Sequence, residues 1–442
     1  MKQFVKAKDT RLYFGEKPLF LRGLGVGSWL NMEHFMLGIP TPDSMIRQSF
    51  TEVYGEENAE NFFDDFFKSF LQAEDFQVLK DTGINFIRVP FNHRIFLNEQ
   101  TGEYLEYGFA MMKRLLDFCE EYKIFVMPDL HTTPGGQNPD WHSDNRSGIP
   151  QFWEFAALRH QMTKLWGEIA KRFSSYEYLL GYDLLNEPSM ASWEAMNSFY
   201  EETITEIRRY DTNHAIVLEG DMFAMDFSGL NHFDDSNIVL SFHYYPTVWN
   251  DKLLDKDMPR EKRWEEFESG LLRLASIREQ FKRPVICGEA GYDLHPDDMD
   301  FCMDLLEDTI AIFEKHEINW AIWTYKDAAF MGMVYPKSDT PWMQLAQKLR
   351  EKWTHYKEME QGKRMIHSAA EEFGGISENL AYKLQFRMRA ILYEMQKEEI
   401  LIPTLRDIPW EEIKTAPSSF LLENCEIWDC YQKLLQKFTQ KN

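Results

Sequence analysis

The chain has 442 residues, of which 44% are hydrophobic and 15% aromatic, and its formal net charge is −24. This is the composition of a globular protein with one large domain and an appendage, or with two to three smaller domains. The acidic balance argues against nucleic acid or an anionic membrane as a partner, because both bind basic surfaces. No run reaches the roughly 18 apolar residues that a membrane-spanning helix needs.

The N-terminus and the cysteines favour a location in the cytoplasm. The chain opens with Met1-Lys2-Gln3-Phe4, without the apolar region of a signal peptide. Its five cysteines are odd in number and widely spaced, and most lie in apolar runs, which indicates reduced thiols. We therefore expect a cytoplasmic protein.

Strand and helix patterns alternate along most of the chain. Residues 1–20 predict a small hairpin, residues 27–50 an irregular loop, and residues 59–82 a helix with apolar side chains close to every 3.6 residues. Short, nearly all-apolar runs are typical of strands buried on both faces of a parallel sheet. Such runs predict eight strands, at residues 19–25, 85–90, 124–130, 179–187, 215–218, 238–245, 284–289 and 319–325. Further helices are predicted at residues 108–122, 151–174, 193–210, 264–281, 296–316 and 341–356.

This alternation predicts an α/β fold, a (β/α)8 TIM barrel in a catalytic domain of residues 1–356, with the N-terminal hairpin against the barrel floor. An open, doubly wound sheet is the alternative. However, the glycine-rich stretch at residues 23–27 is not followed by the helix that a dinucleotide site requires. Residues 357–442 show no strand alternation, and apolar stripes at helical spacing predict a C-terminal helical extension. This extension either packs back on the barrel or joins copies of the chain into a homo-oligomer.

Polar residues stand at the ends of the predicted strands. Glu187 follows Asn186 at the end of the run LLGYDLLNEP, and Glu289 ends the strand in RPVICGEAG. The carboxyl ends of parallel strands are where barrels carry their chemistry, and two carboxylates there are what glycoside hydrolysis needs. The other strand ends lead to Glu33, Arg88, His131, His243, Tyr245 and Trp323.

The ordered set resembles glycoside hydrolase family 5, the cellulase-like barrels that place two glutamates after strands four and seven. The matching residues are Arg88 in IRVPF, His131 in PDLH, Asn186 and Glu187 in NEP, His243 and Tyr245 in HYY, Glu289 in CGEAG, and Trp323 in AIWTY. Within the family, the chain is most similar to the exo-β-1,3-glucanase and β-glucosidase group. The stretches GSWL before Glu33, AEDF at residues 73–76 and HTTPGGQN at residues 131–138 carry this likeness. Three features depart from the group: Trp141-His142 in an enlarged loop, TYKD at residues 324–327, and the helical extension.

The resemblance implies a retaining double displacement, with Glu289 as nucleophile and Glu187 as acid/base, their carboxyl groups about 5–5.5 Å apart. Arg88 and Tyr245 are expected to keep Glu289 ionised. The charge of Glu289 is expected to raise the pKa of Glu187. The resemblance also implies sugar-binding roles: Asn186 for the 2-hydroxyl, His131 and His243 for sugar hydroxyls or Glu187, Trp323 for the face of the sugar ring, and Glu33 for hydroxyls of the terminal sugar.

We therefore expect an exo-acting hydrolase of β-glucosides or short β-glucan oligosaccharides that needs no cofactor and no metal. A metal site formed by His131, Asp140, His142 and Asp144 is an alternative, although the polarity of the loop explains these residues better. Two alternative functions stay open. One is an endo-β-glucanase or mannanase with an open cleft, and the other is a catalytically silent, carbohydrate-binding barrel.

Overall fold

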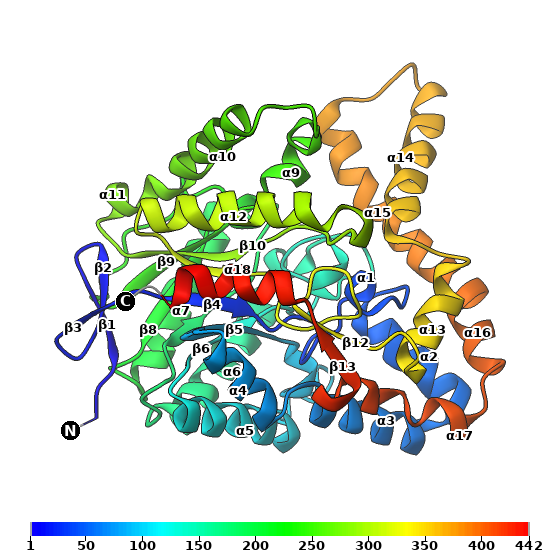
Figure 1. The fold of residues 1–442 in the computed structure, drawn as a ribbon, viewed down its shortest axis with the longest axis horizontal. Helices are drawn as coiled ribbons and strands as arrows, with labels where there is room; N and C mark the ends of the chain where they lie inside the picture. Colours follow the sequence, from blue (N-terminus) through cyan, green and yellow to red (C-terminus); the bar gives the residue numbers. More distant parts are fainter. Residues whose placement is uncertain (1, 441–442) are drawn as a thin grey trace.

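The computed structural model describes residues 2–440, apart from the side chains of residues 355 and 359. Eight parallel strands close into a barrel in the order β10-β11-β4-β5-β6-β7-β8-β9 (Figure 1). Their bounds are β4 (Arg22–Gly25), β5 (Phe86–Phe91), β6 (Phe125–Leu130), β7 (Gly181–Asp183), β8 (Ala215–Glu219), β9 (Ile238–His243), β10 (Val285–Ala290) and β11 (Asn319–Ile322). The predicted TIM barrel is confirmed, and burial on both faces explains why its strands are apolar without alternation.

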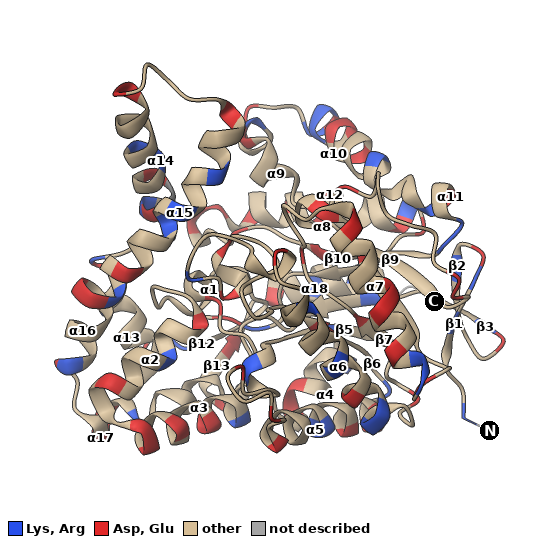
Figure 2. Cartoon of the chain, turned by 180° about the vertical axis from the view of Figure 1, so that it is seen from behind, with Lys and Arg blue, Asp and Glu red and all other residues tan. Residues whose placement is uncertain are grey.

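Helices surround the barrel on its outside. They are α3 (Glu56–Phe70), α4 (Ala73–Asp81), α5 (Glu106–Tyr122), α6 (Ala156–Phe173), α7 (Trp193–Arg208), α10 (Arg260–Ala275), α11 (Ile277–Phe281), α12 (Met299–Lys315) and α13 (Pro341–Arg350). Each long helix buries one apolar stripe; in α3 the stripe includes Phe62, Phe66 and Phe70. Acidic and basic residues lie interspersed over the outer helices (Figure 2).

The region between the first two barrel strands is more helical than predicted. The expected loop at residues 27–50 contains α1 (His34–Leu37) and most of α2 (Asp43–Tyr54). The helix expected at residues 59–82 is divided into α3 and α4, because Leu71 has an extended backbone. The carboxylate of Asp75 then accepts a hydrogen bond from the backbone N–H of Gln72 at 2.7 Å, which caps the start of α4.

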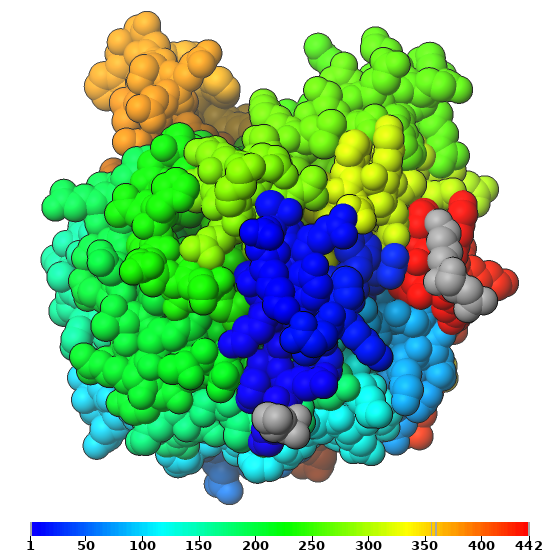
Figure 3. Space-filling view, turned by 90° about the vertical axis from the view of Figure 1, so that its left-hand side faces the viewer, coloured from blue at the N-terminus to red at the C-terminus, as the bar shows by residue number. Residues whose placement is uncertain are grey.

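The barrel floor is covered by a three-stranded antiparallel sheet rather than by the predicted two-stranded hairpin. Its strands are β1 (Val5–Lys8), β2 (Arg11–Phe14) and β3 (Lys17–Leu19). Leu19 therefore ends a floor strand instead of opening the first barrel strand. Val5 and Leu12 are buried with Phe86 and Phe125 at the bottom of the barrel. In Figure 3 this sheet, in blue, covers the centre of the floor.

The C-terminal extension wraps around the barrel and returns to it. Its elements are α14 (His355–Glu371), α15 (Glu378–Gln396), the π-helical turn η6 (Lys397–Leu401), α16 (Ile402–Arg406), α17 (Trp410–Ile413), β13 (Cys425–Ile427) and α18 (Asp429–Thr439). The strand β13 was not predicted; it pairs antiparallel with β12 (Val334–Pro336), which follows the barrel. Figure 1 shows α14 and α15 standing beside the barrel mouth, while α18 runs back along α12.

The extension shares its core with the barrel. Phe420 is fully buried, and its ring lies 5.0 Å from that of Phe70 and 4.9 Å from that of Trp342. The ammonium group of Lys326, also fully buried, donates to the backbone carbonyls of Phe70 and Phe420 at 2.8 and 2.9 Å. Among residues 2–440, no helix has the length and apolar character needed to cross a membrane.

Candidate active site

The structure brings all nine predicted site residues to the carboxyl end of the barrel strands. Arg88, His243 and Glu289 belong to strands β5, β9 and β10. The other six lie just beyond the ends of strands: Glu33 after β4, His131 after β6, Asn186 and Glu187 after β7, Tyr245 after β9, and Trp323 after β11. Each strand is fixed by burial of its apolar residues, so the polar residues that follow are held over the same opening.

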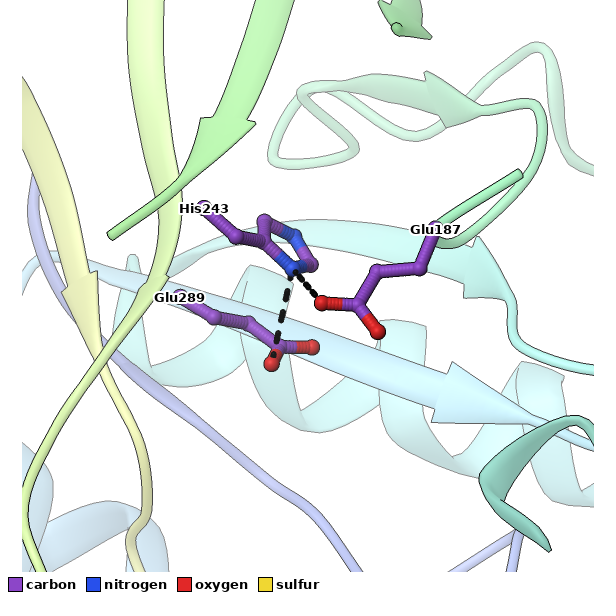
Figure 4. A group of neighbouring side chains, drawn as sticks. All are labelled: Glu187, His243 and Glu289. Atoms are coloured by element: carbon purple, nitrogen blue, oxygen red, sulfur yellow. Dashed lines mark hydrogen bonds and ion pairs between the residues drawn. The ribbon is translucent and has the colours of Figure 1, made fainter. Parts of the chain in front are cut away.

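The two glutamates face one another across the mouth (Figure 4). One oxygen of Glu187, one oxygen of Glu289 and a ring nitrogen of His243 all lie within 4.8 Å of one another. Nδ1 of His243 is 2.7 Å from Oε1 of Glu187 and 3.6 Å from Oε2 of Glu289. The side chains of Glu187 and Glu289 are only 13% and 8% exposed. The pair is therefore largely buried at the mouth of the barrel.

Two donors hold the carboxylate of Glu289. Nη1 of Arg88 donates to Oε1 at 2.6 Å, and the hydroxyl of Tyr245 donates to Oε2 at 2.8 Å. Both oxygens of the Glu289 carboxylate are therefore fixed in place by these donors. The sequence prediction that these two residues neighbour Glu289 is confirmed by these contacts.

Arg88 is fully buried and is surrounded by acceptors below the glutamate pair. Its guanidinium lies 3.0 Å from Asp183, 3.1 Å from Glu219 and 3.2 Å from Asp129, and it donates to the amide oxygen of Asn186 at 2.8 Å. Burial lowers the pKa of Arg88, but the surrounding carboxylates raise it well above its ordinary value. The guanidinium therefore fixes Asn186 and Glu289 from below as a permanent cation.

Two imidazoles hold the carboxylate of Glu187. Nδ1 of His243 lies at 2.7 Å from Oε1, and Nε2 of His142 lies at 3.0 Å from Oε2. Burial raises the pKa of Glu187, but the hydrogen bonds and charges of these two imidazoles lower it well below its ordinary value. Burial lowers the pKa of His243, yet the carboxylates around it raise it well above the ordinary value. The expectation that Glu289 raises the pKa of Glu187 is thus wrong: the neighbouring imidazoles outweigh it.

The backbone around Glu187 also fixes its side chain. The residue has a φ of 46°, in the left-handed region that non-glycine residues rarely adopt. Its backbone N–H donates to Oε2 of Glu219 at 2.7 Å, and its carbonyl accepts from the amide of Asn138 at 3.0 Å. These bonds turn the chain at the end of β7, so the carboxylate faces the opening.

Glu33 and His131 form the opposite wall of the opening. Oε1 of Glu33 is buried and has no hydrogen-bond partner among the described residues. Burial and the charges of Glu289 and Glu187 raise the pKa of Glu33 well above its ordinary value. Burial lowers the pKa of His131 to about 3, so its imidazole is neutral at physiological pH. Its Nδ1 lies 2.6 Å from Asp129 and its Nε2 lies 3.4 Å from the amide nitrogen of Asn186.

Trp323 supplies an aromatic face beside this wall. Its ring is parallel to that of His131, with the ring centroids 6.1 Å apart. A Cβ atom on Gly25 or Gly27 would lie 2.4 or 2.3 Å from the Trp323 ring, too close for any side chain. The glycines at the end of the first barrel strand therefore make room for this tryptophan. This packing explains why the stretch is rich in glycine, and a dinucleotide site is not needed to explain it.

The sequence of the barrel matches a known family. Residues 50–329, more than half of the chain, match the family model Cellulase (glycosyl hydrolase family 5). The chain belongs to glycoside hydrolase family 5. It is therefore a glycoside hydrolase that acts on β-glycosides, and the resemblance inferred from the sequence is confirmed.

Relatives of this family 5 member differ in activity. The chain is 32% identical over 362 residues to a β-xylosidase of Phanerodontia chrysosporium, covering 77% of this chain and 75% of that protein. It is 23% identical to endoglucanase C of Acetivibrio thermocellus (61% of this chain, 88% of that one). It is 24% identical to a glucan 1,3-β-glucosidase of Pichia angusta (55% of each chain). Among solved structures, Cel5A of Thermotoga maritima in complex with mannotriose shares the fold, with a TM-score of 0.53, 17% identity, and coverage of 71% of this chain and 92% of that one.

The sequence analysis missed Asp183 and Glu219 of this family 5 site, and it considered His142 only as a metal ligand and not as a partner of Glu187. Asp183 is the one charged residue inside the apolar run of strand β7, and this was a readable signal. Glu219 ends strand β8, one residue beyond the predicted strand. His142 gave a weaker signal, because only its place in an enlarged loop was visible and its contact with Glu187 depends on long-range packing.

The loop residues considered for a metal site have other partners. Asp140 pairs with Arg389 at 3.0 Å, and Asp144 pairs with Arg94. Within the described part of the chain, the group with metal-ligand spacing is Glu187, His243 and Glu289, which is the glutamate pair itself. The carboxylate oxygens of that pair already have partners: Arg88 and Tyr245 bind Glu289, and His142 binds Glu187.

Proposed function

We propose that this family 5 hydrolase is a retaining, exo-acting β-glycosidase that releases a terminal sugar from β-glucosides or short β-glucans. The observation that carries the proposal is the closeness of the glutamates: one carboxyl oxygen of Glu187 lies within 4.8 Å of one carboxyl oxygen of Glu289. Retaining enzymes place the two carboxyl groups about 5–5.5 Å apart, whereas inverting enzymes need about 6.5–9.5 Å to admit a water.

In the first step, Glu289 attacks the anomeric carbon while Glu187 protonates the glycosidic oxygen. Arg88 and Tyr245 hold the attacking carboxylate in place with bonds of 2.6 and 2.8 Å. The bond from the anomeric carbon to the leaving oxygen breaks as the bond to Glu289 forms. Asn186, held by Arg88, presents its amide nitrogen for the 2-hydroxyl, a contact that strengthens in the transition state.

In the second step, water attacks the glycosyl–enzyme ester and Glu187 accepts its proton. Formation of the ester removes the negative charge of Glu289, so the demand on Glu187 changes from acid to base. The imidazoles of His142 and His243 lie within 3.0 Å of the Glu187 carboxylate, close enough to exchange a proton with it. The proposed double displacement requires neither a metal nor a cofactor.

Exo action is supported by the burial of the site. The side chains of Glu187 and Glu289 are 13% and 8% exposed, and Glu33 is 3% exposed. A site buried to this degree suits a chain end better than the middle of a polymer. The names of two relatives, the β-xylosidase and the glucan 1,3-β-glucosidase, agree with this view, whereas the endoglucanase favours an open cleft.

The test is release of nitrophenol from aryl β-D-glucoside, β-D-xyloside and β-cellobioside by the purified protein, beside Glu289→Gln and Glu187→Ala. We expect release from a monosaccharide glycoside that is lost in Glu289→Gln, and the β-anomer of the sugar as the first product by NMR. First release of the α-anomer would overturn the retaining assignment. Release from the cellobioside alone would indicate an endo-glucanase.

A β-xyloside is the second candidate substrate, because the 32% identical relative is a β-xylosidase. The xyloside arm of the same assay decides between the two sugars. No release from any of the three glycosides, with no cleavage of mannan, would favour the catalytically silent, carbohydrate-binding barrel.

A cytoplasmic location and a homo-oligomer formed through residues 357–442 stay predictions. Free thiols support the first. The free cysteines are Cys119, Cys287, Cys302 and Cys425, which are buried, and Cys430, which is exposed. Light scattering of the purified protein would test the second.

A further inference from the structure

The enlarged loop after strand β6 brings a second imidazole to Glu187. His142 lies in the short 3-10 turn η2 (Trp141–Ser143), and its Nε2 is 3.0 Å from Oε2 of Glu187. The side chain of His142 is only 10% exposed. Since His243 holds the other oxygen of Glu187, the carboxylate lies between one imidazole from a barrel strand and one from a loop.

The C-terminal extension fixes this loop. The carboxylate of Asp140 caps η2 by accepting from the backbone N–H of Trp141 at 2.8 Å. Two nitrogens of Arg389, in α15, bind the two oxygens of Asp140 at 3.0 and 3.2 Å, although the residues are 249 positions apart in the sequence. Trp141 is buried together with Tyr393 of the same helix.

A bond from the barrel side completes the support of η2. The amide of Asn31 donates to the backbone carbonyl of His142 at 3.1 Å. The backbone of η2 is therefore held from the barrel and from the extension. The place of His142 depends on both attachments.

Resting on the proposed acid/base role of Glu187, we propose that His142 is a positioning residue for proton transfer, and that Arg389 of the extension holds it in place. The proton leaves Nε2 of His142, passes to Glu187 and ends on the glycosidic oxygen, whose bond to the anomeric carbon breaks with its electron pair. In the second step the proton of the attacking water returns to Glu187 and then to His142. Atoms and charge balance over the two steps.

The charges around His142 agree with this role. Burial lowers the pKa of His142, but the hydrogen bond to Glu187 and the charges of Glu187, Asp140 and Glu289 raise it above its ordinary value. Nε2 has two polar neighbours, Oε2 of Glu187 at 3.0 Å and the amide nitrogen of Asn138 at 2.8 Å. The surrounding charges favour the protonated imidazole beside a carboxylate whose own pKa is lowered. This arrangement supplies an acid at Glu187 although the pKa of Glu187 itself is lowered.

The test uses the full chain and aryl β-glycosides whose leaving groups range from phenol to dinitrophenol. Phenol is a poor leaving group that needs protonation, whereas dinitrophenol leaves without it. We expect His142→Ala to lower kcat/KM about 100-fold for the phenyl glycoside and less than about tenfold for the dinitrophenyl glycoside. His142→Gln keeps a donor without a transferable proton and should restore the KM but only part of kcat.

Arg389→Met should change the same ratio in the same direction, by a smaller factor. The matched control is Arg387→Ala, since Arg387 is exposed on the same helix and should leave both rates unchanged. Equal losses on both substrates in His142→Ala, in a protein that melts as the wild type does, would overturn the role of His142. Arg389→Met behaving like Arg387→Ala would overturn the role of the extension.

Glu187→Ala separates this inference from the proposed function. If the loss of kcat/KM depends on the leaving group in Glu187→Ala but not in His142→Ala, the role of His142 is rejected while the proposed function stands. A second measurement needs no turnover: the 15N shifts of the His142 ring report whether both nitrogens carry protons. We expect a protonated ring near neutral pH in the wild type and a neutral ring in Glu187→Ala, and a neutral ring in both would reject the proposal.

Discussion

The surroundings of Glu289 and of Glu187 are built from different parts of the molecule. Glu289 is held by Arg88 and Tyr245, which belong to barrel strands or follow them directly. Glu187 is held by His243 from a strand and by His142 from a loop that α15 supports. The comparison teaches that the proposed nucleophile is held by the barrel alone. The proposed acid/base, in contrast, is held also through a helix beyond the barrel.

Glu289→Gln should give the largest loss of activity, and it tests the residue that the barrel alone holds. The amide is nearly isosteric but cannot attack, so we expect kcat/KM for an aryl β-glycoside to fall by about 10⁴-fold or more. Thermal melting should change little, because the amide can still accept from Arg88. Loss of only tenfold in activity would place the nucleophile elsewhere.

Arg88→Met should show how much the cation beside Glu289 contributes to the stability of the protein. It leaves Asp129, Asp183 and Glu219 buried without their cation, which typically costs about 3–5 kcal/mol. Urea unfolding measures this loss. Burial raises the pKa of Asp129 and Asp183 well above the ordinary value even beside Arg88. Burial also raises the pKa of Glu219, but His243 and Arg88 lower it below its ordinary value. Without the cation the folded-state pKa of Glu219 rises, so the loss of stability should be smallest below about pH 4 and grow above it. A loss that is the same at every pH would mean that Glu219 is neutral in the wild type.

Glu33→Gln should weaken binding of the sugar and should leave the surroundings of both Glu289 and Glu187 unchanged. The raised pKa of Glu33 favours its neutral form. A hydrogen bond between neutral groups contributes about 0.5–1.5 kcal/mol, so kcat/KM should fall roughly twofold to tenfold. Because Glu33 faces the sugar rather than the leaving group, phenyl and dinitrophenyl glycosides should lose the same factor. Unequal losses would indicate that Glu33 takes part in proton transfer.

The most gradual effect is expected in the acid sensitivity of folding. Burial lowers the pKa of His131 to about 3, whereas the unfolded chain has its ordinary value near 6.5. The unfolded state therefore binds one more proton between these values, and stability falls with decreasing pH by at most about 1.4 kcal/mol per pH unit. His131→Asn should lack this contribution. An unchanged slope in urea unfolding between pH 6.5 and 4 would contradict the prediction.

The barrel and its nine site residues were predictable because each depends on local pattern. A buried strand requires an uninterrupted apolar run, and the polar residue that follows it must lie at the mouth. The break between α3 and α4 was not predicted, because one extended residue, Leu71, interrupts an apolar stripe that reads as continuous. His142 could not be assigned, since its place depends on a contact between Asp140 and Arg389 across 249 positions. Strand β13 was missed for the same reason: its partner β12 lies far away in the sequence.

The return of the chain to the barrel bears on how the protein folds as it is made. Phe420 packs on rings of α3 and α13, β13 pairs with β12, and Thr439 donates to the carbonyl of Thr82, just before strand β5. Domains commonly fold in order as the ribosome releases them. Here, segments made early wait for partners that are synthesised much later. We therefore expect the barrel to complete its core only after Phe420 has left the ribosome, so that nascent chains stopped before Phe420 stay sensitive to protease.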